Sequence, residues 1–322
     1  MKQTTLPTKE SIIEASKRIA PFVHRTPILR SAFFDKKTNS SLFFKCENFQ
    51  KVGAFKSRGA TNACLLLTSK ERKSGVTTHS SGNHAQALAR AAGILDMKSY
   101  IVMPETAAKI KVEATRQYGG IIRFCKPTLA AREQTLQEIV EQTGATVIHP
   151  YNDFRIIEGQ ATACLELLSQ TDEKLDYVFC PVGGGGLLSG TALALAYFSP
   201  ETKLIGCEPL RANDAKRSFD TKTFVPSENP KTIADGLLTS LGSLTFPIIC
   251  NFVSDIITVD ESEIVDALKL VWERTKIIIE PSSAVAVAVA ISGKINLKNK
   301  KAAVILSGGN VDLNQLALFF NN

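Results

Sequence analysis

The stretch that decides the fold is Pro181-Val182-Gly183-Gly184-Gly185-Gly186-Leu187-Leu188-Ser189-Gly190. It follows four residues, Tyr177 to Cys180, that predict a buried strand, and it leads into an apolar helix from Leu187. A glycine-rich loop between a strand and a helix lets the backbone approach a ligand closely, and the helix N-terminus favours an anion such as phosphate. A purely structural turn is the alternative, although four consecutive glycines cost conformational entropy. The loop lacks the Lys-Ser/Thr pair of a Walker A motif.

On both sides of this loop, short β-rich runs alternate with helical runs, which is typical of parallel sheets covered by helices. We predict strands at 42–46, 76–79, 100–103, 121–124, 146–148, 177–180, 204–207, 256–259 and 302–306. We predict helices at about 58–68, 85–92, 107–118, 129–142, from 187, at 261–276, and a short one from Leu313. Residues 284–290 alternate Val and Ala as a strand would, but Pro281-Ser282-Ser283 indicates a helix start, so we predict a buried helix.

The strand series predicts the fold class α/β, with two open parallel-sheet α/β domains. Residues 1–74 and 150–322 are predicted to form the larger domain, and residues 75–149 the smaller one. The smaller domain is expected to close over the substrate and exclude water.

The composition excludes several classes of function. The chain has 322 residues, 44% of them hydrophobic, and a net charge of +7, but its lysines and arginines are spread out, which argues against nucleic-acid binding. No secretory signal and no membrane span are predicted. The seven cysteines are at least sixteen residues apart, which predicts reduced thiols in a cytoplasmic protein and no Cys-x-x-Cys metal site.

A lysine stands in the segment Gly53-Ala54-Phe55-Lys56-Ser57-Arg58-Gly59-Ala60, in a turn before a helix. A lysine that forms a Schiff base must be deprotonated, and partial burial lowers its pKa toward that state. The alternative is an ordinary surface lysine at a helix start.

Two further polar loops follow predicted strands. Ser80-Ser81-Gly82-Asn83-His84 opens a helix and offers hydroxyl, amide and backbone N–H groups to an anionic ligand, or simply caps that helix. Leu306-Ser307-Gly308-Gly309-Asn310 places a hydroxyl where the last strand ends, the usual position for ligands in open α/β sheets.

These four motifs, in their order along the chain, resemble the fold type II (tryptophan synthase β-like) family of pyridoxal-phosphate enzymes. Within it they are most similar to the serine racemase and serine/threonine dehydratase group, which includes L-threo-3-hydroxyaspartate dehydratases. The resemblance extends from Arg25 to Asn310. It implies a serine racemase that also eliminates water from serine or threonine to give a keto acid and ammonia. The alternative is a hydroxyaspartate dehydratase or a catabolic threonine/serine ammonia-lyase without racemase activity.

The resemblance also implies roles for individual residues. Lys56 would carry the cofactor and act as the base on one face of it, and Ser307 would face the pyridine nitrogen. A neutral hydroxyl there does not keep the nitrogen protonated, which favours β-elimination over long-lived carbanions. The other implied cofactor ligands are Phe55, Asn83, Gly183, Gly184, Gly185, Gly186 and Gly236. The loop Ser80, Ser81, Gly82, Asn83 and His84 would hold the substrate carboxylate.

Two positions bear on which reaction is catalysed. In serine racemases the serine that matches Ser81 lies opposite the lysine, and racemisation needs acid/base groups on both faces. Ser81 could instead only bind the substrate carboxylate. Arg132 matches an arginine near the substrate and could pair with the second carboxylate of hydroxyaspartate, or it could be an exposed helix arginine.

A metal, a nucleotide and a second subunit are also implied. Glu208, the carbonyl of Ala212 and Asp214 match the divalent-cation site of serine racemases, with Mg²⁺, Ca²⁺ or Mn²⁺ as the ion. The alternative is that these carboxylates pair with Arg211 or Lys216. Some serine racemases bind ATP as an effector at the interface of a homodimer. The polar residues that match this site are Ser31, Lys51, Gln86, Tyr118 and Lys276. At two further positions of the site, this sequence has Ala32 and Val52 in place of polar residues.

Two classes from outside this family are weighed against it. A nicotinamide-dependent dehydrogenase would need a G-x-G-x-x-G turn after an early strand, and none is found. A non-catalytic binding protein on the same fold would be expected to lose the lysine, and Lys56 is intact.

Overall fold

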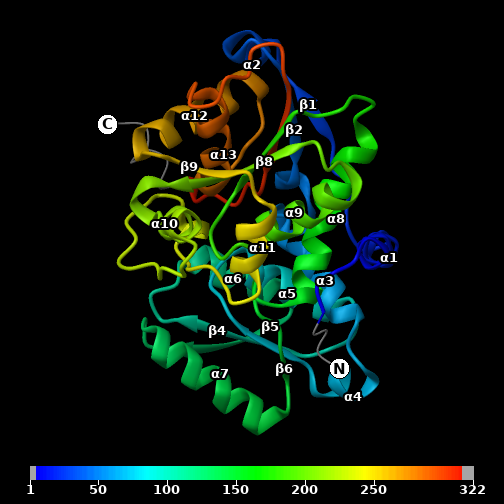
Figure 1. The fold of residues 1–322 in the computed structure, drawn as a ribbon. Coiled ribbons are helices and arrows are strands. Elements are labelled where there is room, and N and C mark those ends of the chain that lie inside the picture. Colours follow the sequence, from blue (N-terminus) through cyan, green and yellow to red (C-terminus); the bar gives the residue numbers. More distant parts are fainter. Residues whose placement is uncertain (1–4, 314–322) are drawn as a thin grey trace.

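Two open sheets organise the protein in the computed structural model, which describes residues 5–313 (Figure 1). The larger sheet has the order β1-β2-β10-β7-β8-β9. Its strands are β1 (Ile28–Arg30), β2 (Ser41–Cys46), β7 (Tyr177–Pro181), β8 (Lys203–Pro209), β9 (Asp255–Val259) and β10 (Lys301–Leu306). All neighbours are parallel except the short edge strand β1, which pairs antiparallel with β2. The predicted strands of this sheet are confirmed, and β1 is an addition to them.

The smaller sheet is entirely parallel, with the order β5-β4-β3-β6. It comprises β3 (Val76–His79), β4 (Ser99–Pro104), β5 (Gly120–Cys125) and β6 (Thr146–Val147). It lies below the larger sheet in Figure 1. The α/β class with two parallel-sheet domains is therefore confirmed. We propose domain boundaries after residues 74 and 149, which keep each sheet within one domain.

Helices cover the faces of both sheets (Figure 1). They are α1 (Lys9–Ile19), α2 (Ala32–Thr38), α3 (Lys56–Leu65), α4 (Ser69–Ser74), α5 (Asn83–Gly93), α6 (Lys109–Gln117), α7 (Leu129–Thr143), α8 (Phe154–Gln170), α9 (Gly186–Phe198), α10 (Asp214–Thr221), α11 (Thr245–Phe252), α12 (Glu261–Thr275) and α13 (Pro281–Ile291). Short 3₁₀ turns occur at Glu47–Phe49, Lys51–Gly53, Leu210–Ala212 and Asp235–Leu237.

The predicted helix over residues 284–290 is confirmed as α13, whose residues 281–290 are all buried. A helix buried on every side needs no amphipathic stripe, so its Val/Ala alternation carried no strand information. By contrast, the sequence analysis did not predict α8, a helix of 17 residues that packs on α9 and α3. Arg155 and Glu158 are buried in α8, and such polar positions interrupt the apolar periodicity. The helix predicted from Leu313 lies outside the described residues.

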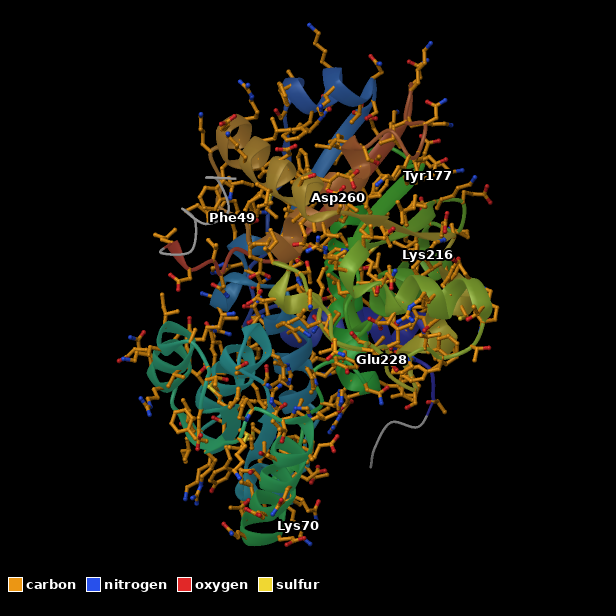
Figure 2. All side chains as sticks on the ribbon, turned by 90° about the vertical axis from the view of Figure 1, so that its left-hand side faces the viewer. Phe49, Lys70, Tyr177, Lys216, Glu228 and Asp260 are labelled. Atoms are coloured by element: carbon orange, nitrogen blue, oxygen red, sulfur yellow. The ribbon has the colours of Figure 1, made fainter. Side chains whose placement is uncertain are left out.

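The core lies in separate layers on either side of the sheets. One apolar cluster joins α13 and α12 to the larger sheet, and a second joins α8 and α9 to the same sheet. A third cluster fills the space between α3, α5 and the smaller sheet. Lysines on the surface are dispersed, as Lys70 and Lys216 illustrate in Figure 2. Among residues 5–313, no helix is both long enough and apolar enough to cross a membrane.

Candidate active site

Lys56 is the first residue of α3 and is delivered by a tight turn. Val52 and Gly53 both have positive φ, 56° and 69°, and a side chain on Gly53 would collide with Asn310. The Lys56 Nζ donates a hydrogen bond of 2.9 Å to the Pro150 carbonyl. Burial lowers the pKa of the Lys56 amine to about 8, although the nearby Glu280 carboxylate opposes the shift. A substantial fraction of this amine is therefore neutral near physiological pH, as a nucleophilic lysine requires.

The four-glycine loop runs from the end of β7 into the N-terminus of α9. Gly185 has φ +88°, which glycine adopts without strain. A Cβ on Gly184 would lie 2.3 Å from the Tyr151 ring, and one on Gly185 would lie 2.8 Å from Thr245. Larger residues would therefore displace the walls of this loop. The free N–H groups of a helix N-terminus are a site for an anion such as phosphate.

The loop of residues 80–84 lies where β3 ends and α5 begins. The Asn83 Nδ2 donates to both carboxylate oxygens of Glu280, at 2.9 and 3.1 Å. His84 is buried, and its Nε2 lies 3.1 Å from the Ile148 carbonyl, which can only accept a hydrogen bond. Burial, aided by the Lys56 charge, lowers the pKa of His84 to about 3. His84 is therefore a neutral imidazole that donates from Nε2, close to the lysine.

Two more loops from the larger domain converge on the same place. Ser307 follows β10, is 2% exposed, and its carbonyl accepts from the Phe55 N–H at 3.0 Å. The Lys56 Nζ lies 5.2 Å from the centroid of the Phe55 ring. The Gly236 N–H donates to the Ser282 Oγ at 2.9 Å, and the Gly236 carbonyl abuts Gly183. The structure thus brings the predicted loops of both domains together.

The remaining predicted substrate residues lie at or near the end of β3. Ser80 donates its N–H to the Val102 carbonyl, and its Oγ accepts from the Gly82 N–H. Ser81 lies between them and is partly exposed. Arg132 approaches from α7, and its buried Nε has no hydrogen-bond partner. The pKa of His79, directly before Ser80, is lowered by burial and then by the Arg132 charge. Arg132 is therefore directed toward the end of β3 and is not a fully exposed helix arginine.

The site residues fit a pyridoxal phosphate. They combine a buried amine with a lowered pKa, a cradle that admits only glycine before a helix N-terminus, and an amide whose nitrogen has hydrogens to donate. Each of these features suits one part of that cofactor: the aldehyde, the phosphate and the ring hydroxyl.

The predicted metal ligands lie between β8 and α10. The Glu208 carboxylate accepts from the N–H groups of Ala215 and Lys216, both at 2.8 Å. Asp214 is buried, and its Oδ2 has no hydrogen-bond partner. Burial raises the pKa of Glu208 to about 9 and that of Asp214 to about 6. An orphaned buried carboxylate oxygen beside a second carboxylate fits a hard divalent cation.

The alternative interpretation of these carboxylates is not supported at Lys216. The Lys216 ammonium forms ion pairs with Asp220 and Asp255, at 2.9 and 3.3 Å. No group of three or more His, Cys, Asp or Glu side chains able to hold a metal occurs within residues 5–313. A cation here would need the Ala212 carbonyl and water to complete its coordination.

A buried ion network anchors α3 two residues beyond Lys56. Arg58 is 1% exposed and its Nε and Nη2 each donate to the Glu47 carboxylate at 2.7 Å. Arg58 also donates to Glu166, which accepts from the buried Lys45 at 2.6 Å. Two cations and two carboxylates therefore balance one another in the interior.

Several site residues escaped the sequence analysis. Glu280 is buried beside Asn83, and burial, aided by Asp235, raises its pKa to about 7. Tyr151 covers the glycine loop. Lys111 of α6 forms an ion pair with Asp235, which joins the two domains next to Gly236. Of these residues, only Glu280 was marked locally in the sequence, because it is an acid directly before Pro281, the proline that begins α13.

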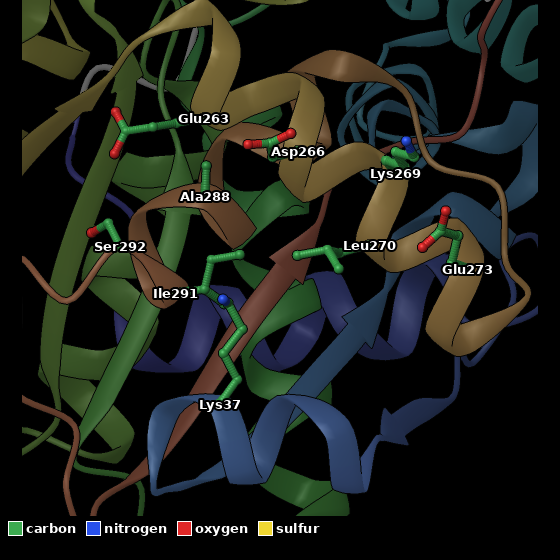
Figure 3. A pocket seen from close by; sticks show the side chains of 9 residues that line it. All are labelled: Lys37, Glu263, Asp266, Lys269, Leu270, Glu273, Ala288, Ile291 and Ser292. Atoms are coloured by element: carbon green, nitrogen blue, oxygen red, sulfur yellow. The ribbon is translucent and has the colours of Figure 1, made fainter. Parts of the chain in front are cut away.

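A surface pocket lies elsewhere, between α2, α12 and α13 (Figure 3). It is lined by Lys37, Glu263, Asp266, Lys269, Leu270, Glu273, Ala288, Ile291 and Ser292. These residues adjoin the C-terminal end of α13, whereas Glu280 adjoins its N-terminal end. A helix of 11 residues separates the two places by roughly 16 Å.

Comparison with known proteins defines the class. The chain belongs to the pyridoxal-phosphate dependent enzyme family, whose model matches residues 19–308. Among its relatives is a beta-hydroxyaspartate dehydratase of Paracoccus denitrificans, 47% identical over 311 residues that cover 97% of this chain and 98% of the relative. A serine racemase of Dictyostelium discoideum is 46% identical over 319 residues, covering 98% of each.

The fold agrees with these relatives. The structure of maize serine racemase superimposes with a TM-score of 0.94 and 42% identity, covering 98% of this chain and 97% of that one. The predicted family, cofactor class and racemase or ammonia-lyase chemistry are therefore confirmed.

Proposed function

We propose that the protein is a serine racemase that also dehydrates serine and threonine to a keto acid and ammonia. The observations that carry the proposal are the buried Lys56 amine, whose pKa burial lowers to about 8, and the presence of a serine, Ser81, in the loop at the end of β3. Racemisation needs one group to remove the α-proton and another to return a proton to the opposite face.

Pyridoxal phosphate, when bound, supplies the electron sink that acidifies the α-carbon of the amino acid. Lys56 then holds or moves the proton at its Nζ, and Ser81 supplies one from its hydroxyl. The loop of residues 80–84 orients the substrate carboxylate with its N–H groups. Ser307 presents a neutral hydroxyl, which favours loss of the β-hydroxyl. Arg132 is proposed to lie beside the substrate.

Hydroxyaspartate dehydration is the second candidate. The Arg132 Nε is buried and without a partner, which leaves a donor for a second carboxylate. The Paracoccus relative carries that activity in its name. A catabolic threonine or serine ammonia-lyase without racemase activity is the third candidate, in which Ser81 only binds substrate.

The test is incubation of the purified holoenzyme with L-serine and Mg²⁺, with D-serine and pyruvate measured in the same tube. We expect both products, and we expect Ser81→Ala to abolish D-serine while pyruvate persists. Ser169→Ala, on the surface end of α8, is the matched control. Pyruvate without D-serine in the wild type would overturn the racemase proposal, and L-threo-3-hydroxyaspartate is then the next substrate.

We also propose a divalent cation, Mg²⁺ or its substitutes Ca²⁺ and Mn²⁺, held by Glu208, Asp214 and the Ala212 carbonyl. The orphaned Asp214 oxygen supports it. An ATP effector site is also proposed on the polar residues Ser31, Lys51, Gln86, Tyr118 and Lys276, although Ala32 and Val52 depart from its pattern.

A homodimer is proposed on the face that carries Phe49. Phe49, labelled in Figure 2, is 44% exposed. Ile278 is 50% exposed, and its carbonyl accepts a hydrogen bond from the amide of Asn48, the residue before Phe49. Exposed apolar side chains that lie together support a subunit interface. Sedimentation of wild type and Phe49→Asp tests this. A cytoplasmic location is supported by the seven free cysteines.

A further inference from the structure

The Asn83 side chain is held from two sides by residues that the proposed function does not use. Its Nδ2 donates to the Glu280 carboxylate at 2.9 Å, and its Oδ1 accepts from the Asn310 Nδ2 at 2.9 Å. The two partners also contact each other, because the Glu280 carboxylate accepts from the Asn310 N–H at 3.2 Å. The three residues therefore form a closed hydrogen-bonded triangle.

Each end of the triangle is fixed by a group that can only accept. The Asn310 Nδ2 also donates to the Val52 carbonyl at 2.7 Å, so the nitrogen of Asn310 must face Val52 and Asn83. Its remaining hydrogen must then meet the oxygen of Asn83. At the other end, an ionised Glu280 offers only acceptor oxygens, so the nitrogen of Asn83 must face Glu280. The amide of Asn83 consequently has one allowed orientation out of two.

We propose that Glu280 and Asn310 are positioning residues that lock the Asn83 amide, so that its nitrogen offers a donor hydrogen to the cofactor's ring hydroxyl. The inference rests on the proposed role of Asn83 as a cofactor ligand. An amide nitrogen has two hydrogens, and one of them, shared between the two Glu280 oxygens at 2.9 and 3.1 Å, leaves the other for the cofactor. With the amide reversed, an oxygen would face the cofactor and could not donate.

The triangle also joins the two domains. Asn83 begins α5 beside the smaller sheet, whereas Glu280, Asn310 and Val52 belong to the larger domain. The carbonyl that Asn310 holds belongs to Val52, whose φ is +56° in the turn leading to Lys56. The orientation of the amide is therefore coupled to the turn that delivers the lysine.

The charges around Glu280 suit this role. Burial and Asp235 raise the pKa of Glu280, while the Asn83 amide, Lys111 and the Asn310 N–H lower it. Lys56 also lies within electrostatic reach of Glu280. The hydrogen bonds from Asn83 and Asn310 oppose the rise, so the locked orientation belongs to the ionised carboxylate, which predominates above a pH of about 7.

The experiment is a double-mutant cycle on the holoenzyme. Glu280→Gln and Asn310→Ala are made in the wild type and in Asn83→Ala, and two properties are measured: cofactor retention by equilibrium dialysis and the pH dependence of the visible cofactor absorbance. We expect each single change to weaken retention roughly three- to tenfold and to shift the absorbance titration, since one hydrogen bond is at stake. In the Asn83→Ala background neither change should have a further effect.

The proposal would be overturned if Glu280→Gln and Asn310→Ala had their full effects in the Asn83→Ala background. It would also be overturned if neither change affected cofactor retention or the absorbance titration in the wild type. Glu158→Gln is the matched control, because Glu158 is a buried carboxylate that accepts from the amide of Asn62 at 2.9 Å. It should leave both cofactor properties unchanged. If Asn310→Ala fails to fold, Asn310→Asp keeps the size but removes the donor. A wild type that binds no cofactor would instead refute the proposed function.

Discussion

Replacement of Glu47 by glutamine is expected to destabilise the protein strongly. Glu47 is fully buried, and its carboxylate accepts two hydrogen bonds from Arg58 and one of 2.6 Å from Thr26. Without its charge, the cations Lys45 and Arg58 face Glu166 alone. Removing one partner of a buried ion pair costs about 3–5 kcal/mol, because the other charge is left uncompensated.

The assay is urea and thermal unfolding of the holoenzyme followed by circular dichroism. At about 2 °C per kcal/mol for a chain of this size, the melting temperature should fall by roughly 6–10 °C. Because α3 begins at Lys56, two residues before Arg58, cofactor retention should weaken as well. The control is Arg30→Ala, which removes a partly exposed pair with Asp35 and should cost less than about 1 kcal/mol.

A second variant separates charge balance from lost contacts. The double replacement Glu47→Leu with Arg58→Met removes one charge of each sign and leaves the Lys45–Glu166 pair intact. It should be more stable than either single variant, since apolar replacements of a buried pair are often neutral. The reasoning would be refuted if the free energy of unfolding of Glu47→Gln lay within about 1 kcal/mol of the wild-type value. It would also be refuted if the double variant lost as much stability as the two single variants added together.

Four other outcomes are expected. Mg²⁺ at a hundred times its dissociation constant should stabilise the wild type by about 2.7 kcal/mol and so raise its melting temperature. It should not raise the melting temperature of Asp214→Ala, and an equal rise in both proteins would contradict the metal site. Lys111→Met removes the ion pair with Asp235 between the domains, so the KM for serine should increase while the melting temperature changes little, because the pair is partly exposed. Covalent loading of the apoenzyme with pyridoxal phosphate should accelerate about tenfold from pH 6 to 7 and level off above pH 8. The reason is that the pKa of Lys56, lowered to about 8 by burial, leaves its protonated form dominant below that value; a rate independent of pH would contradict it. Gly184→Ala places a methyl group against the Tyr151 ring, so it should lower the free energy of unfolding by about 1–3 kcal/mol and weaken cofactor retention. An unchanged stability would show that the ring moves freely.

The strands other than β1, the ligand loops and the family could be predicted from the sequence, because the signals are local. A β-rich run followed by Gly183 to Gly186 and an apolar helix start lies within ten residues, and the loop at 80–84 is equally compact. Each such motif carries its own backbone requirement, such as the positive φ of Gly185. Periodicity was less informative where a segment is largely buried, as α8 and α13 are.

Only the tertiary structure decided which distant residues complete the site. Glu280 and Asn83 are hydrogen-bonded although 197 positions separate them in the sequence, and Asn310 and Val52 although 258 positions separate them. No sequence motif marks either pair. The balance of Lys45, Arg58 and two carboxylates likewise depends on burial, which a sequence does not display. Neighbouring residues determine the local backbone conformation, and a sequence shows them directly. The burial that shifts a pKa and the hydrogen bonds that orient an amide arise only when remote segments pack together and exclude water.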